Sequence, residues 1–264
     1  MISNSLLKGI VPDIICSRFS SARWNRESIP VPREMALTIY LDSKELITLP
    51  CTPTKLTELV FGALFLRGII TDKNDVTSIH VDEEGSVANV KLKKPGNTSP
   101  ALRTLALRRA SAVAFTSQRQ VVNSNLKVSP THVLSMMKQL NESAEIYRFS
   151  GGVHTSALGD GKNLMLVAED ISRHSTVDKI IGECLLMEIP TKDKILLTTG
   201  RISSETLRKT ILTEIPIVVS RGSPTDYAIS LAKELGITLI GYARSKRLSV
   251  YSHQERLKGA LENH

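Results

Sequence analysis

Four short, nearly continuous apolar runs in the second half of the chain restrict its fold more than any other feature. The runs are LMLVA (164–168), ILLTT (195–199), IPIVV (215–219) and ITLIG (237–241). Strands that are buried on both faces of a parallel sheet have such sequences, because neither face meets water. Helical patterns separate the runs, and this alternation of strand and helix predicts an α/β layered domain.

Helices are expected between and after these runs. Their sequences are VDKIIGECLLME (177–188), SETLRKTILTE (204–214) and SPTDYAISLAKELG (223–236). Ser175 and Asp178 have the spacing of a capping box at the start of the first helix. Ser223 and Pro224 suit the N-cap and first helical position of the third. A further helix is expected to begin at Ser129–Pro130.

The first half of the chain predicts a smaller α+β domain. Two strands, MALTIYL (35–41) and ELITLP (45–50), precede a helix for which Thr54 is the expected N-cap. VTSIHV (76–81) and SVANVKL (86–92) then predict a hairpin.

We therefore expect three parts along the chain. Residues 1–30 form an N-terminal segment that looks weakly structured. Residues 31–110 form the smaller α+β domain, and residues 111–264 form the larger α/β domain. The stretch KKPGNTSP (93–100) is expected to be a loop or a boundary.

Composition narrows the class of partner. The chain has 264 residues and a formal net charge of +8, which favours anionic partners. Aromatic residues make up only 4%, so a single-strand nucleic-acid binder with stacking platforms is disfavoured. No apolar run reaches about 18 residues and no signal-peptide pattern is present. We expect a soluble, cytoplasmic protein that binds neither nucleic acid nor membrane.

Cysteine and histidine spacing gives no metal signature. Cys16, Cys51 and Cys184 are far apart and form no C-x-x-C pair, so a zinc ribbon is not expected. His154 and His174 have no cysteine nearby and fit no compact zinc motif. We therefore expect no directly bound metal.

Three stretches that follow apolar runs predict a polyanion site. EDISRHS, GRISSE and SRGSP follow the first, second and third runs; each carries an Arg and Ser, and each leads into a helix. Ligands of such sheets lie beyond the carboxyl ends of the strands, near helix N-termini that attract anions. Converging loops of this kind suit a nucleotide or dinucleotide better than a single carboxylate.

Within these loops, Arg173 and His174 are the clearest candidates for ligand contact. Cations at a helix N-terminus oppose the helix dipole, and capping does not need them, so a bound anion would explain them. Arg201 occupies the corresponding place in the second loop. Arg244 and its basic neighbours follow the fourth run, where an anion contact is at least as plausible as a solvated strand end.

The segment FSGGVHTSALGDG leaves two interpretations open. Gly151 and Gly152 allow either close approach of the backbone to a ligand or an ordinary tight turn, and the turn is the simpler reading. His154 is either a base or ligand contact, or a structural histidine.

Together these motifs resemble the formate dehydrogenase accessory protein family, FdhD. The matching stretches are GGVHTSAL, EDISRHSTVDKIIGE, TTGRISSE, SPTDYAISLAKELGITLIGYAR and RLSVYSH, with TKLTELVFGALFLRGII in the first half. The resemblance covers roughly residues 30–257.

The resemblance implies a fold and a function. The larger domain would be cytidine deaminase-like but without zinc chemistry. Family members are homodimers that take sulfur from a cysteine desulfurase as a persulfide. They pass it to the bis-molybdopterin guanine dinucleotide cofactor and act as chaperones for its insertion into formate dehydrogenase. The family segment matching GYARSKR is associated with cofactor binding. It places that role on Tyr242, Ala243, Arg244, Ser245, Lys246 and Arg247.

One departure puts the sulfur-transfer step in question. The family loop T-S-S-C-G-x-C-G corresponds here to TSQRQVVN (116–123), so Arg119 and Val122 replace the two cysteines. Only a thiolate is both nucleophile and sulfur carrier. Cys16 is the least constrained substitute. We therefore predict no catalytic residue and leave the enzyme status open.

Two other functions remain open from the sequence. One is a non-catalytic nucleotide- or partner-binding relative that kept only the pocket. The other is a small-molecule hydrolase or deaminase that uses His154 or His174. The predicted cofactor contacts are Gly151, Gly152, His154, Arg173, His174, Arg201 and residues 242–247.

Overall fold

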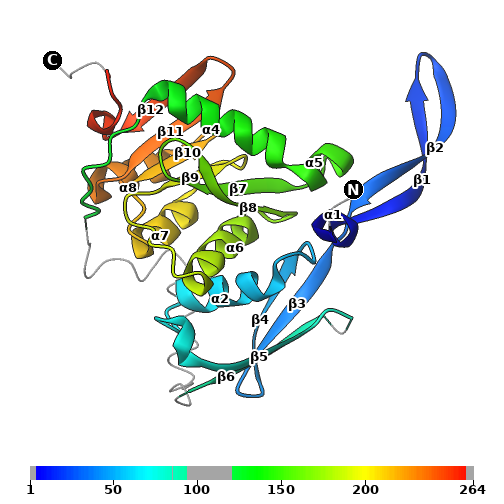
Figure 1. Cartoon of the computed structure of the whole chain (residues 1–264). Helices are drawn as coiled ribbons and strands as arrows, with labels where there is room; N and C mark the ends of the chain where they lie inside the picture. The colour runs from blue at the N-terminus through cyan, green and yellow to red at the C-terminus, as the bar shows by residue number, and fades with distance from the viewer. Residues whose placement is uncertain (1–3, 85, 94–120, 260–264) are drawn as a thin grey trace.

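The computed structural model describes residues 4–84, 86–93 and 121–259, and it has a mixed α/β fold (Figure 1). Its three sheets are a six-stranded sheet of order β12-β11-β10-β9-β7-β8, a four-stranded sheet of order β4-β3-β6-β5, and the two-stranded pair β1-β2. The predicted α/β class is confirmed. The predicted domain boundary at residue 110 lies outside the described residues.

The six-stranded sheet comes entirely from the second half of the chain. Its strands are β7 (His154–Gly159), β8 (Leu164–Asp170), β9 (Ile195–Thr198), β10 (Ile217–Ser220), β11 (Thr238–Arg244) and β12 (Arg247–Ser252). Strands β9, β10 and β11 are parallel, as their apolar runs predicted. Residues of β9 and β10 are buried at every position, because helices cover both faces.

The first apolar run has a different place from the one predicted. LMLVA lies in β8, an edge strand that pairs antiparallel with β7. Its burial alternates along the strand, with Leu166 and Ala168 buried and Met165 exposed. A short apolar run does not distinguish a buried parallel strand from such an edge strand, since only the neighbouring strand decides.

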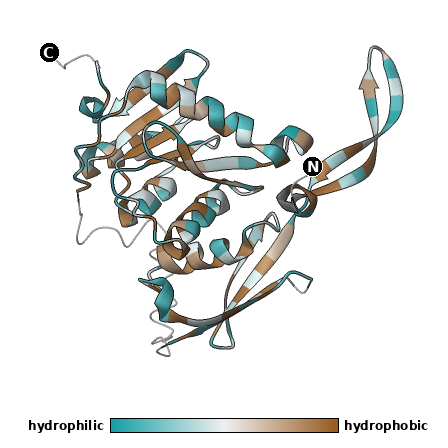
Figure 2. Cartoon of the chain, viewed as in Figure 1, coloured by the Kyte–Doolittle hydropathy of each residue, from teal (hydrophilic) through white to brown (hydrophobic). Residues whose placement is uncertain are grey.

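Helices cover the two faces of this sheet with separate apolar clusters. Helix α4 (Pro130–Ser143) packs on one face, with Val133 and Met136 among its buried residues, and leads into the short helix α5 (Glu145–Ser150). The other face is covered by α6 (Arg173–Leu186), α7 (Ser204–Leu212) and α8 (Asp226–Leu235). Figure 2 shows hydrophobic residues along the strands between these layers.

Two predicted helix starts in the larger part are wrong. Ser172, not Ser175, is the N-cap of α6, and its hydroxyl accepts a hydrogen bond from the Ser175 amide. Helix α8 likewise begins after Thr225, whose hydroxyl accepts from the Ala228 amide, rather than after Ser223. Several Ser and Thr residues stand near each start, and the sequence does not decide which of them leaves the helical conformation.

The smaller part has the predicted strand and helix order. Its elements are β3 (Met35–Leu41), β4 (Lys44–Cys51), α2 (Leu56–Leu66), the turn η1 (Lys73–Asp75), β5 (Val76–Asp82) and β6 (Val87–Leu92). Thr54 does not cap α2; Lys55 stands at the N-cap with φ 49°. The Thr54 side chain is buried and accepts a hydrogen bond from Lys179 on α6.

Helices α2 and α6 join the two parts at a very close crossing. A Cβ added to Gly62 would lie 1.9 Å from the Asp178 carbonyl oxygen, and one added to Gly182 would lie 1.8 Å from that of Glu58. The two glycines therefore face each other where the helices come closest. Neither position has room for a side chain.

The N-terminal segment is structured, contrary to the prediction. After helix α1 (Asn4–Gly9), strands β1 (Ile10–Ser20) and β2 (Arg23–Pro32) pair antiparallel in a long hairpin. Figure 1 shows this hairpin projecting from the body of the molecule. Its mixture of exposed polar and apolar residues lacks the clean alternation that marks a strand with one face in a core.

No helix among the described residues is long and apolar enough to cross a membrane.

Candidate functional site

The predicted convergence of loops at one sheet edge is present. Strand β8 runs parallel to β9 because both pair antiparallel with β7. The loops after β8, β9, β10 and β11 therefore share one end of the sheet. Backbone hydrogen bonds connect them: the Arg221 amide donates to the Thr198 carbonyl at 3.1 Å, and the Tyr242 amide to the Gly222 carbonyl at 2.9 Å.

An open depression lies at this edge. Its volume is about 490 Å³, which is in the range of ligand pockets, roughly 300–1,000 Å³. The lining residues come from α5, β7 and the loops after β9 and β10. They are Tyr147, Gly151, Gly152, Val153, His154, Thr199, Arg221 and Gly222.

His154 lines this depression, and the charges of Arg173 and Arg201 lie near it. Burial lowers the pKa of His154 most, and the positive charges of Arg173 and Arg201 lower it further. His154 is therefore neutral at neutral pH, and the positive charge around it comes from the guanidinium groups of Arg173 and Arg201. Arg201 also lies close to the lining, since a Cβ added to Gly222 would be 3.6 Å from the Arg201 Cα.

Arg173 is held in an environment that favours a bound anion. Burial and the nearby Arg201 lower the pKa of Arg173, and Glu205 only partly offsets them. Its Nε atom is buried and has no hydrogen-bond partner among the described residues. Arg173 is also the first residue of α6, where backbone amides and the helix dipole attract negative charge.

Gly200 allows Arg173 and His154 to lie close together. A Cβ on Gly200 would lie 3.0 Å from Cβ of Arg173 and 3.6 Å from Nδ1 of His154, so a larger residue would push them apart. The loop is fixed by its own hydrogen bonds. The Thr198 hydroxyl accepts from the Gly200 amide at 3.1 Å, and the Ser220 hydroxyl donates to the Gly200 carbonyl at 2.6 Å.

The glycine pair lines the depression but also has structural roles. Gly151 ends helix α5 with φ 72°, and its amide donates to the Tyr147 carbonyl at 2.7 Å. A Cβ on Gly152 would lie 2.7 Å from the Pro32 ring. The tight-turn reading therefore accounts for Gly151, while close approach to a ligand stays a prediction for both.

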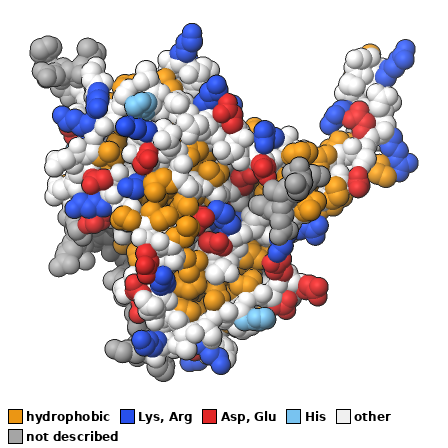
Figure 3. All heavy atoms as spheres, viewed as in Figure 1, with side chains coloured by type: hydrophobic (Ala, Val, Ile, Leu, Met, Phe, Trp, Pro, Cys, Tyr) orange, Lys and Arg blue, Asp and Glu red, His pale blue; other side chains and the backbone are white. Residues whose placement is uncertain are grey.

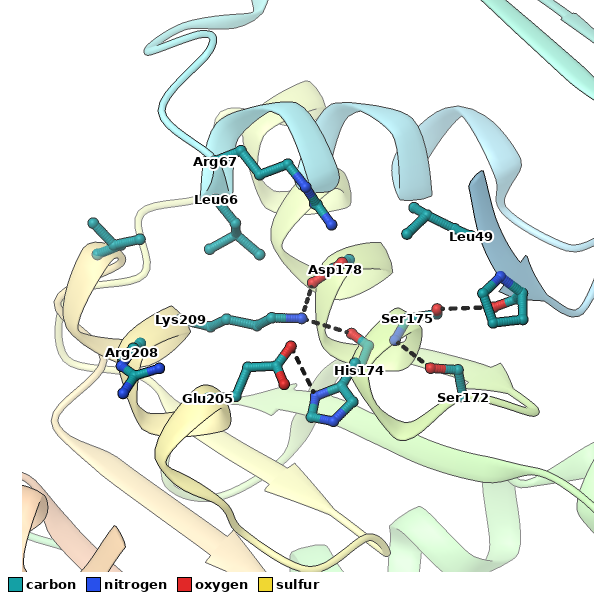
Figure 4. A pocket seen from close by; sticks show the side chains of 12 residues that line it. Leu49, Leu66, Arg67, Ser172, His174, Ser175, Asp178, Glu205, Arg208 and Lys209 are labelled. Carbon is teal, nitrogen blue, oxygen red and sulfur yellow. Dashed lines mark hydrogen bonds and ion pairs between the residues drawn. The ribbon is translucent and has the colours of Figure 1, made fainter. Parts of the chain in front are cut away.

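His174 does not share the depression with His154. Arg173 and His174 are successive residues of α6, so their side chains point about 100° apart. His174 lies in a second cavity of about 110 Å³ between α2, α6 and α7 (Figure 4). Its Nδ1 is 3.4 Å from the Glu205 carboxylate. Burial is the main cause of the lowered pKa of His174, which Glu205 partly counteracts. A cofactor contact by His174 stays a prediction.

The segment 242–247 forms the hairpin of β11 and β12 beyond Gly222. Arg244 lies with its Cζ 6.0 Å from the Tyr242 ring centroid, at the limit of a cation–π contact. Arg244, Lys246 and Arg247 are exposed, whereas the Ala243 side chain is buried in the core. None of these residues lines the depression. Their positive charges lie at the same end of the sheet and extend its basic edge, the row of arginine-bearing loops, beyond the depression.

Most charges of the EDISRHSTVDK run serve the fold. Asp170 and Lys179 form a fully buried ion pair at 2.6 Å, with both side chains 0% exposed. Glu169 accepts hydrogen bonds from the first amides of α5. Asp178, predicted to cap its helix, instead pairs with Lys209 on α7 at 2.5 Å.

The cysteines are poorly placed for a carrier role. Cys51 and Cys184 are buried, and desolvation raises the pKa of each thiol to about 12. Cys16 lies on β1 and is partly exposed. Of the loop 116–123, only residues 121–123 are described; Val122 is buried and its amide donates to the Leu235 carbonyl at 2.9 Å.

Arg221 and Thr199 line the depression but were not among the predicted cofactor contacts, although Arg221 is the arginine of the SRGSP loop. Arg221 extends toward Asn141 of α4, with 3.4 Å between its Nη1 and the amide oxygen. The Thr199 hydroxyl accepts from the Thr155 amide at 3.0 Å and ties β9 to β7. The place of Arg221, directly after a buried strand, was the signal that could have identified it.

Comparison with known proteins gives one consistent result. The model of the FdhD/NarQ family matches residues 32–258. A sulfur carrier protein FdhD of Bacillus licheniformis is 33% identical over 249 residues, which cover 91% of this chain and 95% of the relative. The sulfur carrier protein FdhD of Bacillus subtilis is 35% identical over 233 residues, or 85% and 89% of the two chains.

A solved structure has the same fold. It is the crystal structure of a protein described as a formate dehydrogenase accessory protein from Desulfotalea psychrophila. The two structures superpose with a TM-score of 0.77 at 24% sequence identity, covering 94% of this chain and all of the other.

Proposed function

Because the chain belongs to the FdhD/NarQ family, we propose that it binds the nucleotide end of a bis-molybdopterin guanine dinucleotide cofactor and assists formate dehydrogenase maturation. One observation of the site carries the cofactor part of this proposal. Arg221 lines the depression, and Arg173 and Arg201 lie close enough to His154 in its lining for their positive charges to lower the pKa of that histidine.

The residues present fit the diphosphate of such a ligand. Guanidinium groups bind phosphate oxygens in bidentate fashion, and the N-terminus of α6 adds backbone donors. The orphaned Nε of Arg173 would gain a partner. The cofactor would supply the molybdenum atom that accepts sulfur, while this chain would hold the charged nucleotide end of the cofactor.

Contact of residues 242–247 with the cofactor is part of the same proposal. These residues continue the basic edge beyond Gly222, so they would contact a ligand longer than the depression. The homodimer, the cytoplasmic location and a cytidine deaminase-like layering of the larger part also remain predictions.

GDP, a surrogate for the nucleotide end, should bind the wild type and should bind Arg201→Gln about tenfold more weakly. A loss of that size corresponds to about 1.4 kcal/mol, the contribution of one charge-assisted contact. Isothermal titration calorimetry measures both affinities. Arg244→Ala, titrated in parallel, tests whether the contact extends along the β11–β12 hairpin.

The matched control is Lys138→Gln, which removes one positive charge from an exposed side chain on α4. Its GDP affinity should equal that of the wild type, so that a general charge effect is separated from a contact. Absence of GDP binding by the wild type at millimolar concentration would contradict the proposed polyanion site.

The cysteines favour a second function, that of a cofactor-binding protein that does not itself carry sulfur. With Cys51 and Cys184 buried and the loop cysteines replaced, the chain would bind the cofactor without carrying sulfur itself. The family role would then need a partner that supplies the persulfide.

We expect no stable persulfide on Cys51 or Cys184 after incubation with a cysteine desulfurase and radiolabelled cysteine. The reason is that a thiol with its pKa raised to about 12 is neither ionised nor reachable. Label is counted on the purified protein after gel filtration. Retained label that disappears in Cys16→Ser would restore the carrier function and assign it to Cys16.

A further inference from the structure

Tyr147 is the only tyrosine, phenylalanine or tryptophan among the residues that line the depression at the sheet edge. It lies on α5, and 43% of the residue is exposed. Among the described residues its ring takes part in no hydrogen bond and no ring contact, because the fold uses only the backbone of this residue. The ring is therefore available to a ligand.

The backbone of α5 holds this ring at a fixed place. The Tyr147 amide donates to the Glu169 carboxylate at 2.9 Å, and the Tyr147 carbonyl accepts from the Gly151 amide at 2.7 Å. The preceding residue, Ile146, is 1% exposed and packs in a core cluster with Val153. A tyrosine has only two side-chain torsions to order, so a contact made by this ring would cost little entropy on binding.

The depression has room for more than phosphate groups. Its volume of about 490 Å³ is that of a site for a drug-sized ligand. Open space adjoins α5, since a Cβ added to Gly151 would meet no atom within 4 Å. Arg221, on the loop after β10, adds a cation to the same lining. An aromatic face and a cation are the groups that bind the base and the phosphates of a nucleotide, respectively.

We propose that the Tyr147 ring stacks on the base of the bound nucleotide, so that the depression selects a nucleoside diphosphate over a free diphosphate. This inference rests on the proposed function, which brings the nucleotide end of the cofactor to this depression. Every base has a π face, so the ring would recognise the presence of a base rather than its identity. A single ring suits a single base, in contrast to the row of stacking platforms that a single-strand binder needs.

The charges elsewhere on the molecule do not provide this selection. Figure 3 shows Lys and Arg side chains interspersed with Asp and Glu side chains over the face in view. Attraction to the net charge of +8 acts on every diphosphate alike. GDP and inorganic pyrophosphate share the diphosphate, so the difference between their affinities reports on contacts with the guanosine part.

Tyr147→Ala should bind GDP about tenfold more weakly than the wild type, a loss within the range that stacking of one base supplies. Its affinity for pyrophosphate should not change, because the arginines remain. Tyr147→Phe keeps the ring and loses only the hydroxyl, so it should bind GDP as the wild type does. Isothermal titration calorimetry at one fixed ionic strength measures all of these affinities.

The matched control is Phe149→Ala. Phe149 also lies on α5 and is 53% exposed, but it does not line the depression. Its replacement should leave the affinities for GDP and pyrophosphate unchanged, which separates stacking from a general effect of truncating an aromatic side chain on this helix. Far-UV circular dichroism and thermal unfolding check that each variant keeps its fold.

The outcomes distinguish this inference from the function on which it rests. If Tyr147→Ala leaves GDP affinity unchanged, or weakens GDP and pyrophosphate equally, the ring does not stack on a base, while the polyanion site stands. A wild type that binds pyrophosphate as tightly as GDP leads to the same conclusion. An equal loss of GDP affinity in Tyr147→Phe would assign the contact to the hydroxyl and overturn stacking. A wild type that binds neither ligand contradicts the proposed function, and the stacking inference fails with it.

Discussion

Gly182→Ala should destabilise the protein by about 3 kcal/mol, the upper end of the cost of over-packing. The added Cβ would lie 1.8 Å from the Glu58 carbonyl oxygen, and the obstacle is backbone, which no rotamer change can move. Alanine is favoured over glycine within a helix by about 1 kcal/mol. Helix propensity alone would therefore make the variant more stable, so a loss of stability must come from the clash. Urea unfolding followed by circular dichroism measures the effect.

The crossing also predicts how the losses of stability caused by Gly62→Ala and Gly182→Ala combine. Gly62→Ala should cost a similar amount, because its Cβ would lie 1.9 Å from the Asp178 carbonyl oxygen. The double variant should cost less than the sum, since one separation of α2 from α6 relieves both clashes. Gly222→Ala is the control, because φ is not positive there and its added Cβ would meet no atom closer than 3.6 Å. A Gly182→Ala protein that is more stable than the wild type would contradict this crossing.

Lys179→Met should cost roughly 3–5 kcal/mol, the penalty for leaving one member of a buried ion pair alone. Lys179 is 0% exposed and donates to the Thr52 carbonyl, the Thr54 hydroxyl and the Glu169 carbonyl as well as to Asp170. Its loss removes the ties between α6 and the turn before α2. Lys179→Met/Asp170→Asn should recover part of the stability, because no charge then remains buried.

The pH dependence of this variant has a definite sign. In the wild type burial raises the pKa of Asp170 and Lys179 lowers it. Without Lys179 the pKa rises further, so the folded variant holds a proton that the unfolded chain releases above about pH 4. The stability deficit relative to the wild type should therefore be smallest in acid and should grow as pH rises.

The control for the buried pair is Lys55→Met. Lys55 pairs with Glu183 at 2.6 Å and also joins the two parts, but its side chain is 31% exposed. Solvent screens this pair, so the cost should be about 1 kcal/mol and should change little with pH. Equal losses in the two lysine variants would show that burial does not set the energy of the Asp170–Lys179 pair.

Local periodicity was sufficient to predict most helices and several strands. The apolar residues of α6, including Val177, Ile180 and Ile181, are buried as their spacing indicated. The runs at β9, β10 and β11 are buried parallel strands for the same reason. These signals depend only on residues a few positions apart, so they are readable before any tertiary contact is known.

Strand partners could not be predicted in the same way. LMLVA and ILLTT have similar sequences, yet β8 is an edge strand and β9 is central. The β1–β2 hairpin was missed because its pairing, such as Phe19 with Trp24, gives no core-facing alternation. Which strand lies beside another depends on the packing of the whole sheet, and a short window of sequence carries little of that information.

The family was evident from the sequence alone. The motifs indicated the family, and the arginine-bearing loops indicated an anion site at one sheet edge. The tertiary structure decided which of the predicted arginine and histidine side chains lie together. Arg173 lies beside His154 and Arg201, whereas His174 lies on another side of α6 with Glu205.

Tertiary structure likewise decided which charges of EDISRHSTVDK stabilise the fold. Lys179 finds Asp170 from the adjoining strand, and Thr52, which lies far away in the sequence, completes their hydrogen bonds. The sequence determines which groups can ionise and which can bind an anion. Only the fold determines which of these charges lose their water, because desolvation depends on every chain segment packed around them.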